Sequence, residues 1–171
     1  MTIRSQSRLW IPLLLSLMLA ACGFHLRGML TLPESMKRMA VISNNNDSPL
    51  RQELVEALKV AGVTVVPVGE SAFILSLLDE NFTSTISGIS ASTNTRQYTM
   101  AYRVNYQLMG PNAASIIPPS SLQTVRSLTV DANQILGSNS QEFTIKQEMR
   151  QELIQKILSR LSSKQTKAQL G

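Results

Sequence analysis

The stretch YTMAYRVNYQLM, residues 98–109, alternates strictly between two kinds of side chain. Tyr, Met, Val and Leu occupy its even positions, whereas Thr, Ala, Arg, Asn and Gln occupy nearly all of its odd ones. Side chains of a β-strand point alternately to opposite faces, so this period of two predicts a strand with one buried and one polar side. It is the strongest strand signal in the chain, and the other elements are placed around it.

Two further strands are predicted beside it. Residues 73–92 precede it, and residues 121–132 follow it after a turn-rich region at 110–119. Three successive strands favour antiparallel pairing, with STNTR, residues 92–96, as the tip of the first hairpin.

A strand, a helix and a second strand come before these long strands. Residues 38–43 form a short apolar run, and Ser48 followed by Pro49 fits a helix N-cap with proline at the first helical position. Apolar residues then recur at helical spacing up to a glycine stop at Gly62, and residues 63–68 are rich in valine. This order favours a parallel strand pair joined by an amphipathic helix.

A second amphipathic helix is predicted near the C-terminus, and Ser138 with Gln141 fits a capping box at its start. Its apolar stripe is expected to pack on the core. The stripe consists of Ile145, Met149, Leu153, Ile154, Ile157, Leu158 and Leu161, and the polar positions include Lys146, Arg150, Lys156 and Arg160. Together the elements predict an α+β fold, a mixed sheet of four to five strands packed on one face by two helices.

The N-terminus resembles a lipoprotein signal peptide. Two arginines precede the apolar run at residues 9–21, which at about 13 residues is shorter than the roughly 20 that span a membrane. LAAC, ending at the only cysteine of the chain, resembles a lipobox, so cleavage is expected between Ala21 and Cys22 with a lipid on the Cys22 sulfur. The alternative is an ordinary secretory peptide that leaves a free thiol.

Four segments follow from this interpretation: a signal peptide at 1–21, a lipidated tether at 22–34, a single domain at 35–162 and a flexible tail at 163–171. Removal of the signal peptide leaves 150 residues, enough for one core, and lowers the formal charge from +5 to +3. This modest charge, without interleaved aromatic and basic residues, argues against nucleic acid as a partner.

No constellation predicts catalysis, a cofactor or a metal. The only histidine, His25, lies within the tether. Glu53 and Glu56, like Glu148 and Glu152, are one helical turn apart, which is the spacing of any solvated helix face as well as of an acid–base pair. The sequence is therefore interpreted as that of a protein that is not an enzyme and holds no cofactor.

Neutral polar residues dominate the chain. Ser, Thr, Asn and Gln are about twice as frequent as charged residues, and no charge occurs between Phe82 and Thr95. That arm of the predicted hairpin is either covered by something or kept soluble by its hydroxyl groups.

The chain resembles the LptE family of lipopolysaccharide-assembly lipoproteins in five stretches, which cover nearly its whole length: LAACGFHLRG, MKRMAVIS, PLRQELVEALKVAGVTVV, QYTMAYRVNYQL and IKQEMRQELIQKI. The resemblance implies a compact roll of a sheet packed by two helices. It also implies an outer-membrane lipoprotein that plugs the lumen of the β-barrel protein LptD, assists its assembly and binds lipopolysaccharide. The polar lumen of such a barrel suits a plug with neutral polar surfaces. Gly23 after the cysteine resembles lipoproteins sorted to the outer membrane.

The chain departs from the family at the expected lipopolysaccharide contacts. The family is linked to lipopolysaccharide through basic residues near the hairpin tip and near the start of the last helix, whereas here Arg96 is the only basic residue of the tip and residues 136–141 hold none. The resemblance then implies either phosphate contacts by Arg96, with help from Arg126 or Lys146, or weaker lipopolysaccharide binding. A periplasmic lipid-carrying lipoprotein and an envelope-adhesion lipoprotein are the alternatives. The few aromatic residues argue against the roomy cavity that a lipid carrier needs.

Overall fold

The computed structural model describes residues 32–131 and 135–168. Predictions for the signal peptide, for Ala21 and Cys22 and for most of the tether fall outside these residues. Within the described ranges, none of the helices has the combined length and apolar character that a membrane-spanning helix requires.

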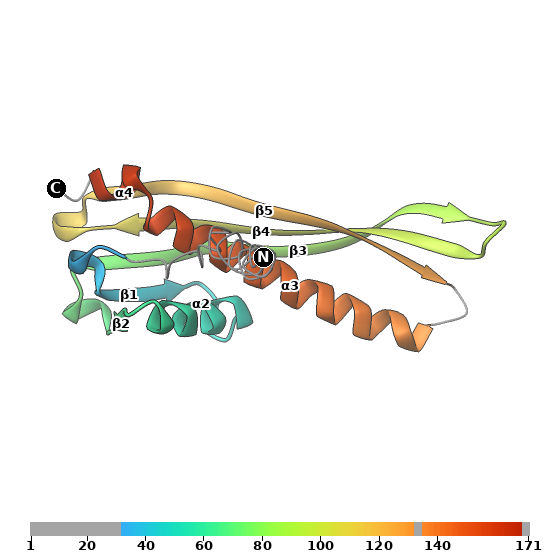
Figure 1. Ribbon diagram of the computed structural model, residues 1–171, viewed down its shortest axis with the longest axis horizontal. Helices are drawn as coiled ribbons and strands as arrows, with labels where there is room; N and C mark the ends of the chain where they lie inside the picture. Colours follow the sequence, from blue (N-terminus) through green and yellow to red (C-terminus); the bar gives the residue numbers. More distant parts are fainter. Residues whose placement is uncertain (1–31, 132–134, 169–171) are drawn as a thin grey trace, which may run out of the picture.

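In the described residues, five strands form one mixed sheet, as predicted, and their order is β2-β1-β3-β4-β5 (Figure 1). The strands are β1 (Arg38–Ser43), β2 (Thr64–Val65), β3 (Phe73–Ser90), β4 (Thr95–Met109) and β5 (Ser115–Asp131). Strand β1 pairs in parallel with β2 and with β3, whereas β3, β4 and β5 pair antiparallel. The sheet is therefore parallel at one end and a long antiparallel ribbon at the other.

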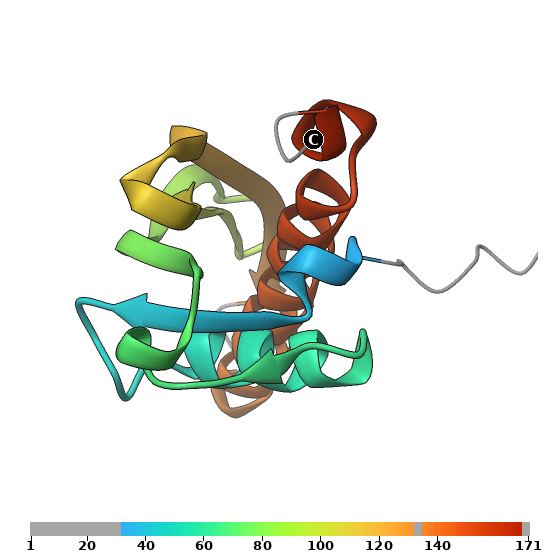
Figure 2. The ribbon, with the colours of Figure 1, turned by 90° about the vertical axis from the view of Figure 1, so that its left-hand side faces the viewer.

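The α-helices are α2 (Pro49–Val60), α3 (Ile135–Leu161) and the short α4 (Lys164–Ala168). Three 3₁₀ turns complete the fold: η1 (Glu34–Met36), η2 (Val68–Glu70) and η3 (Pro111–Ala113). Ser48 caps α2 by accepting a hydrogen bond from the Arg51 N–H, and Gly62 adopts a φ of 84° just after the helix, so both predicted ends are confirmed. In the view along the long strands, the strands curve, α3 lies along one of their faces, and α2 lies next to β1 (Figure 2).

The core lies between the even-numbered face of β4 and the two long helices. Met100, Tyr102 and Tyr106 are buried there. All of the predicted stripe of α3 is buried except Ile145, which is partly buried against the same core. The period of two in β4 and the helical period in α3 thus meet in a single hydrophobic core.

Two predicted element boundaries are wrong. Strand β5 starts at Ser115 and includes Pro118 and Pro119, which a central strand would exclude. Strand β5 is an edge strand, and its register with β4 shifts next to these prolines, so the missing N–H groups cost no ladder hydrogen bond. Helix α3 begins at Ile135, three residues before Ser138, so the helix start predicted at Ser138 is wrong.

Both ends of the domain extend beyond the predicted limits. Leu32, assigned to the tether, is buried in the core. The tail, predicted to be flexible, instead forms α4 over residues 164–168, and Thr166 is buried with its hydroxyl donating to the Arg160 carbonyl at 2.7 Å. The sequence pattern did not predict α4, because this helix has no apolar stripe. Its described contact with α3 is the hydrogen bond from Thr166 to Arg160.

Candidate partner-binding surface

The long strands carry the sheet far beyond β1 and α2 (Figure 1). Strand β1 pairs with β3 only as far as Leu77, whereas β3 and β4 remain paired up to Ser90 and Thr95. We call residues 79–105 the distal hairpin. Its turn comprises residues 91–94, with Asn94 at a φ of 49°, so Thr95 and Arg96, predicted at the tip, lie in the first rungs of β4.

One face of this ribbon, which we call the open face, points away from the helices. Cross-strand rows define it: in one row Arg103 lies between Asn81 and Gln123, and the neighbouring rows of odd-numbered residues are arranged in the same way. The open face consists of Asn81, Thr83, Thr85, Gln97, Thr99, Ala101, Arg103, Gln123, Val125, Ser127 and Thr129. Its only ionisable side chain is Arg103, whose Nη2 donates to Gln123 Oε1 at 3.1 Å. The open face is therefore mostly polar, with Ala101 and the exposed Val125 among its residues, and the rows that flank it at either end add Asp79 and Asp131.

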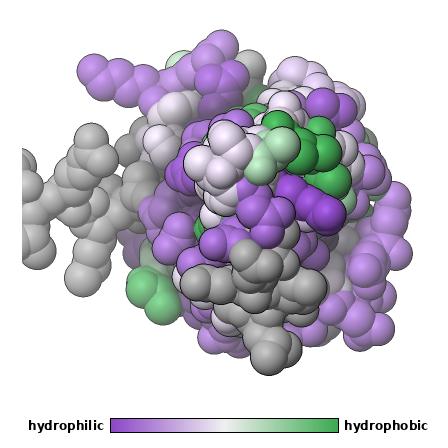
Figure 3. Space-filling view, turned by 90° about the vertical axis from the view of Figure 1, so that its right-hand side faces the viewer, coloured by the Kyte–Doolittle hydropathy of each residue, from purple (hydrophilic) through white to green (hydrophobic). Residues whose placement is uncertain are grey.

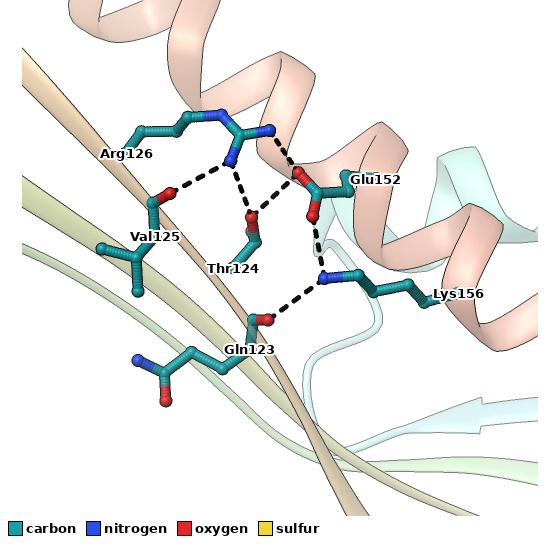
Figure 4. A network of polar contacts seen from close by, with 6 residues as sticks. All are labelled: Gln123, Thr124, Val125, Arg126, Glu152 and Lys156. Carbon is teal, nitrogen blue, oxygen red and sulfur yellow. Dashed lines mark hydrogen bonds and ion pairs between the residues drawn. The ribbon is translucent and has the colours of Figure 1, made fainter.

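A polar network joins α3 to β5 on the opposite face (Figure 4). Glu152 of α3 accepts hydrogen bonds from Arg126 and from the Thr124 hydroxyl, and it pairs with Lys156 at 2.8 Å. The Lys156 ammonium, followed by the Thr124 hydroxyl and the Arg126 guanidinium, lowers the pKa of Glu152 below its ordinary value. Arg126, a predicted lipopolysaccharide contact, is therefore already bound within the protein.

Lys146, the second predicted contact, lies on α3 with its Nζ 4.4 Å from the centre of the Phe82 ring. Phe82 in turn packs edge-to-face on Tyr102, with the ring centres 5.6 Å apart. Lys146 is half-buried and lines, with Ser48 and Glu80, a cleft of about 350 Å³.

The polar groups of this cleft satisfy one another. The Tyr102 hydroxyl donates to one oxygen of Glu80, and the Ser48 hydroxyl donates to the other. Burial, followed by the hydrogen bond to Glu80, raises the pKa of Tyr102 far above its ordinary value of 10.0. These hydrogen bonds link the start of α2 to β3 and β4. Among the described residues, no three side chains are placed to hold a metal ion together.

Arg96, the third predicted contact, stands apart from the other two. It is exposed on β4 between Ile89 and Val130, and the described part of the chain gives its guanidinium no hydrogen bond or ion pair. Arg126 lies opposite Met100. Because Met100 is four residues from Arg96 along β4, the backbones of Arg96 and Arg126 are about 13 Å apart along the strand direction at the usual rise of a strand. The three basic residues therefore do not converge on one site.

A buried ion pair between the two long helices was not predicted. Arg150 is only 7 % exposed, and its Nη2 lies 2.8 Å from Glu53 Oε1. The other oxygen of Glu53 accepts from Gln151 at 2.9 Å. The sequence does contain a signal, because Arg150 precedes Leu153 and Ile154 by three and four residues and so borders the apolar stripe of α3.

The sequence model of the family described as LptE, Lipopolysaccharide-assembly, matches residues 36–161. This range includes every strand and both long helices. The chain belongs to the LptE family. Membership confirms the resemblance found in the sequence.

Two relatives of the LptE family support the assignment. The LPS-assembly lipoprotein LptE of Pectobacterium atrosepticum is 28 % identical over 160 residues, which cover 90 % of this chain and 86 % of that protein. The protein of the same name from Photorhabdus laumondii subsp. laumondii is 24 % identical over 146 residues, covering 85 % of this chain and 79 % of that protein. These names describe an assembly role without catalysis, in agreement with the prediction that this chain is not an enzyme.

Solved structures show the same fold. Lipoprotein B of Nitrosomonas europaea superposes with a TM-score of 0.68 at 23 % identity, covering 82 % of this chain and 90 % of that one. Rare lipoprotein B of Shewanella oneidensis gives a TM-score of 0.67 at 18 % identity, covering 77 % and 98 %. The mixed sheet with its two packed helices is thus the LptE-like fold.

Proposed function

We propose that this protein is an outer-membrane lipoprotein that forms a complex with the β-barrel protein LptD, assists its assembly and takes part in delivering lipopolysaccharide to the cell surface. The open face is the observation that carries the complex with LptD. The lumen of a large transmembrane barrel is polar and wet, so a protein seated in it needs a neutral face that can exchange hydrogen bonds with the wall. The open face meets that need with one arginine among hydroxyl and amide groups.

The proposal includes a lipid anchor on Cys22, exposed by cleavage after Ala21. A single acyl chain holds a protein to a bilayer only marginally, and two or more chains hold it stably. A Cys22→Ala variant should therefore lose both labelling by radioactive palmitate and cleavage of its signal peptide. Palmitate label on that variant would exclude Cys22 as the lipidated residue.

Direct lipopolysaccharide binding is the third part of the proposal, and Arg96 is its first candidate contact. An arginine can hold a phosphate of lipid A with two parallel hydrogen bonds. Arg96 is exposed without a described partner, whereas Arg126 is bound to Glu152 and Lys146 lies over Phe82. Lys146 remains a candidate for a second phosphate contact, because it is only half-buried.

Co-purification of the full-length lipoprotein with tagged LptD from detergent-solubilised membranes tests the complex. Absence of the lipoprotein from the eluate would contradict it and favour the periplasmic lipid carrier or the envelope-adhesion lipoprotein. Lipopolysaccharide affinity of purified variants tests the contact: Arg96→Ala should bind roughly fivefold more weakly, equivalent to about 1 kcal/mol for an exposed charge pair. The matched control Arg103→Ala, on the open face, should keep lipopolysaccharide affinity and weaken LptD binding. Equal lipopolysaccharide affinity of Arg96→Ala and the parent would remove Arg96 from the site.

A further inference from the structure

One edge of the sheet is exposed over much of its length. Strand β3 pairs with β1 only between Phe73 and Leu77. Beyond that point it has β4 on one side, and the described residues place no strand on the other (Figure 1). We call residues 81–90 of β3 the free edge.

Hydrogen bonds fix which backbone groups of the free edge point outward. The carbonyl of Thr99 accepts from the Thr85 hydroxyl, so the odd residues of β4 direct their backbone groups toward β3. Their cross-strand partners on β3, such as Thr83 and Thr85, are also odd. The backbone N–H and C=O groups of the even residues therefore point away from the sheet. Within the free edge these residues are Phe82, Ser84 and Ile86.

The opposite edge of the sheet confirms this alternation and shows what a protected edge looks like. The outward carbonyls of Gln123 and Val125 on β5 accept hydrogen bonds from Lys156 and Arg126 (Figure 4). Pro118 and Pro119 occupy the same strand. Charges and prolines are the usual means by which edge strands avoid pairing with other chains.

The free edge of β3 has neither kind of protection. Residues 81–95 contain no charged residue and no proline. The carbonyl of Leu78, just before the free edge, accepts a hydrogen bond from the Asn44 side chain at 2.6 Å. For the outward groups of Ser84 and Ile86, the described parts of the chain provide no hydrogen bond. A free edge of this length and composition is a template for an additional strand.

Side chains along the free edge specify the kind of strand that fits. Ile86 and Ile89 are 52 % and 73 % exposed, and Ile86 shares a face with Phe82 because their partners Tyr98 and Tyr102 lie on the core side of β4. The hydroxyls of Thr83 and Thr85 occupy the other face. Figure 3, which looks at the hairpin end, shows apolar side chains exposed among hydrophilic ones. An added strand would thus need apolar residues at alternate positions on one side and neutral polar residues on the other.

We propose that the free edge of β3 binds an extended, uncharged segment of the barrel partner by β-strand addition, an inference that rests on the proposed complex with LptD. A closed barrel has no unpaired strand of its own, so the segment comes from a loop or a terminal extension of LptD. Main-chain hydrogen bonds supply the binding, and the exposed isoleucines select a segment with matching apolar residues. No side chain of the free edge itself is charged, so a charged segment would lose hydration there without a counter-charge from the strand that it pairs with.

Proline substitution tests the edge without breaking the sheet. Ser84→Pro removes an N–H that points outward and spares the hydrogen bonds to β4. Ser121→Pro is the matched control, because Ser121 shares the outward parity of Gln123 and Val125 on the opposite edge and lies outside the open face. With the full-length lipoprotein, Ser84→Pro should reduce co-purification with tagged LptD at least tenfold, Ser121→Pro should behave as the parent, and both should keep its thermal midpoint within a few degrees.

A second variant separates binding from folding. Ser84→Lys keeps the backbone N–H and adds the charge that protects other edges, so it should also lose LptD while remaining folded. Normal co-purification of a folded Ser84→Pro or Ser84→Lys protein would overturn the inference and leave the complex with LptD intact. Failure of the parent itself to co-purify would overturn the proposed function, and the inference with it. A dimer of the purified parent that Ser84→Pro dissolves would assign the edge to a second copy and likewise overturn the inference.

Discussion

The guanidinium of Arg150 is held between α2 and α3 by the carboxylate of Glu53. A charge in such a place loses its hydration, and the attraction of its partner compensates for that loss only when the geometry is good and the remaining oxygens are bonded. Here Gln151 completes the shell of Glu53. The pair therefore fixes how the two helices meet, because either charge alone would be left without a partner.

Removing one member of this pair should be more harmful than removing both. Arg150→Met leaves Glu53 beside an apolar surface and should lower the free energy of unfolding by about 3 kcal/mol, as for other buried pairs. The double variant Glu53→Gln with Arg150→Met should lose less than the sum of the single changes. Urea denaturation at pH 7 measures all three proteins. Lys59→Met, which breaks an exposed pair with Glu56, is the control and should cost under about 1 kcal/mol. An equally small loss for Arg150→Met would show that the buried pair contributes nothing.

Helix α3 is attached to the sheet in two different ways. Its C-terminal half makes both attachments. One side of this half packs an apolar stripe on the core, and Glu152 and Lys156 bind the edge of β5 (Figure 4). These polar contacts bind the outward groups of β5 as well as the helix. The same residues thus position α3 and prevent this edge from pairing with another chain.

The lowered pKa of Glu152 makes this attachment sensitive to acid. A carboxylate whose pKa is lower in the folded protein stabilises the fold fully above its ordinary value of 4.5, and that stabilisation disappears as the pH falls through the lowered value. Glu152→Gln should therefore reduce stability at pH 7 by under about 1 kcal/mol, with a smaller difference from the parent at pH 3. Urea denaturation at pH 7, 5 and 3 measures it, with the exposed Glu148→Gln as control. A difference that stays constant down to pH 3 would contradict the assignment.

Local patterns predicted the elements better than their ends. The alternation around Tyr102 and the stripe around Ile154 were sufficient, because burial imposes a period on the sequence that the backbone geometry must match. Pro118 and Pro119 misled the prediction of β5, since proline excludes a central strand but not an edge, and strand order is a property of the whole sheet. The contacts of Arg126 and Arg150 with glutamates on other elements were likewise invisible, because they join residues 26 and 97 positions apart.

At the scale of the whole molecule, the core and the outer part of the distal hairpin, residues 79–99, have separate tasks. No residue between Leu77 and Met100 belongs to the buried hydrophobic core of the described chain. The hairpin nevertheless carries Arg96, the free edge and half of the open face. Exposed polar surface of this extent contributes little to folding, which indicates that its length serves binding.

Shortening the hairpin should therefore separate folding from function. Replacing residues 85–99 with an Asn-Gly turn joins Ser84 to Met100, which already face each other across the ribbon. The shortened protein should still unfold cooperatively, with a thermal midpoint lowered by no more than about 8 °C for the lost pairing of β5, equivalent to roughly 2 kcal/mol. It should no longer bind LptD or lipopolysaccharide. The control replaces only residues 91–94 with the same turn, between the paired Ser90 and Thr95, and should keep both activities because Arg96 and the free edge remain. A shortened protein that folds and still co-purifies with LptD would show that the open face nearer the core, and not the hairpin, provides the binding.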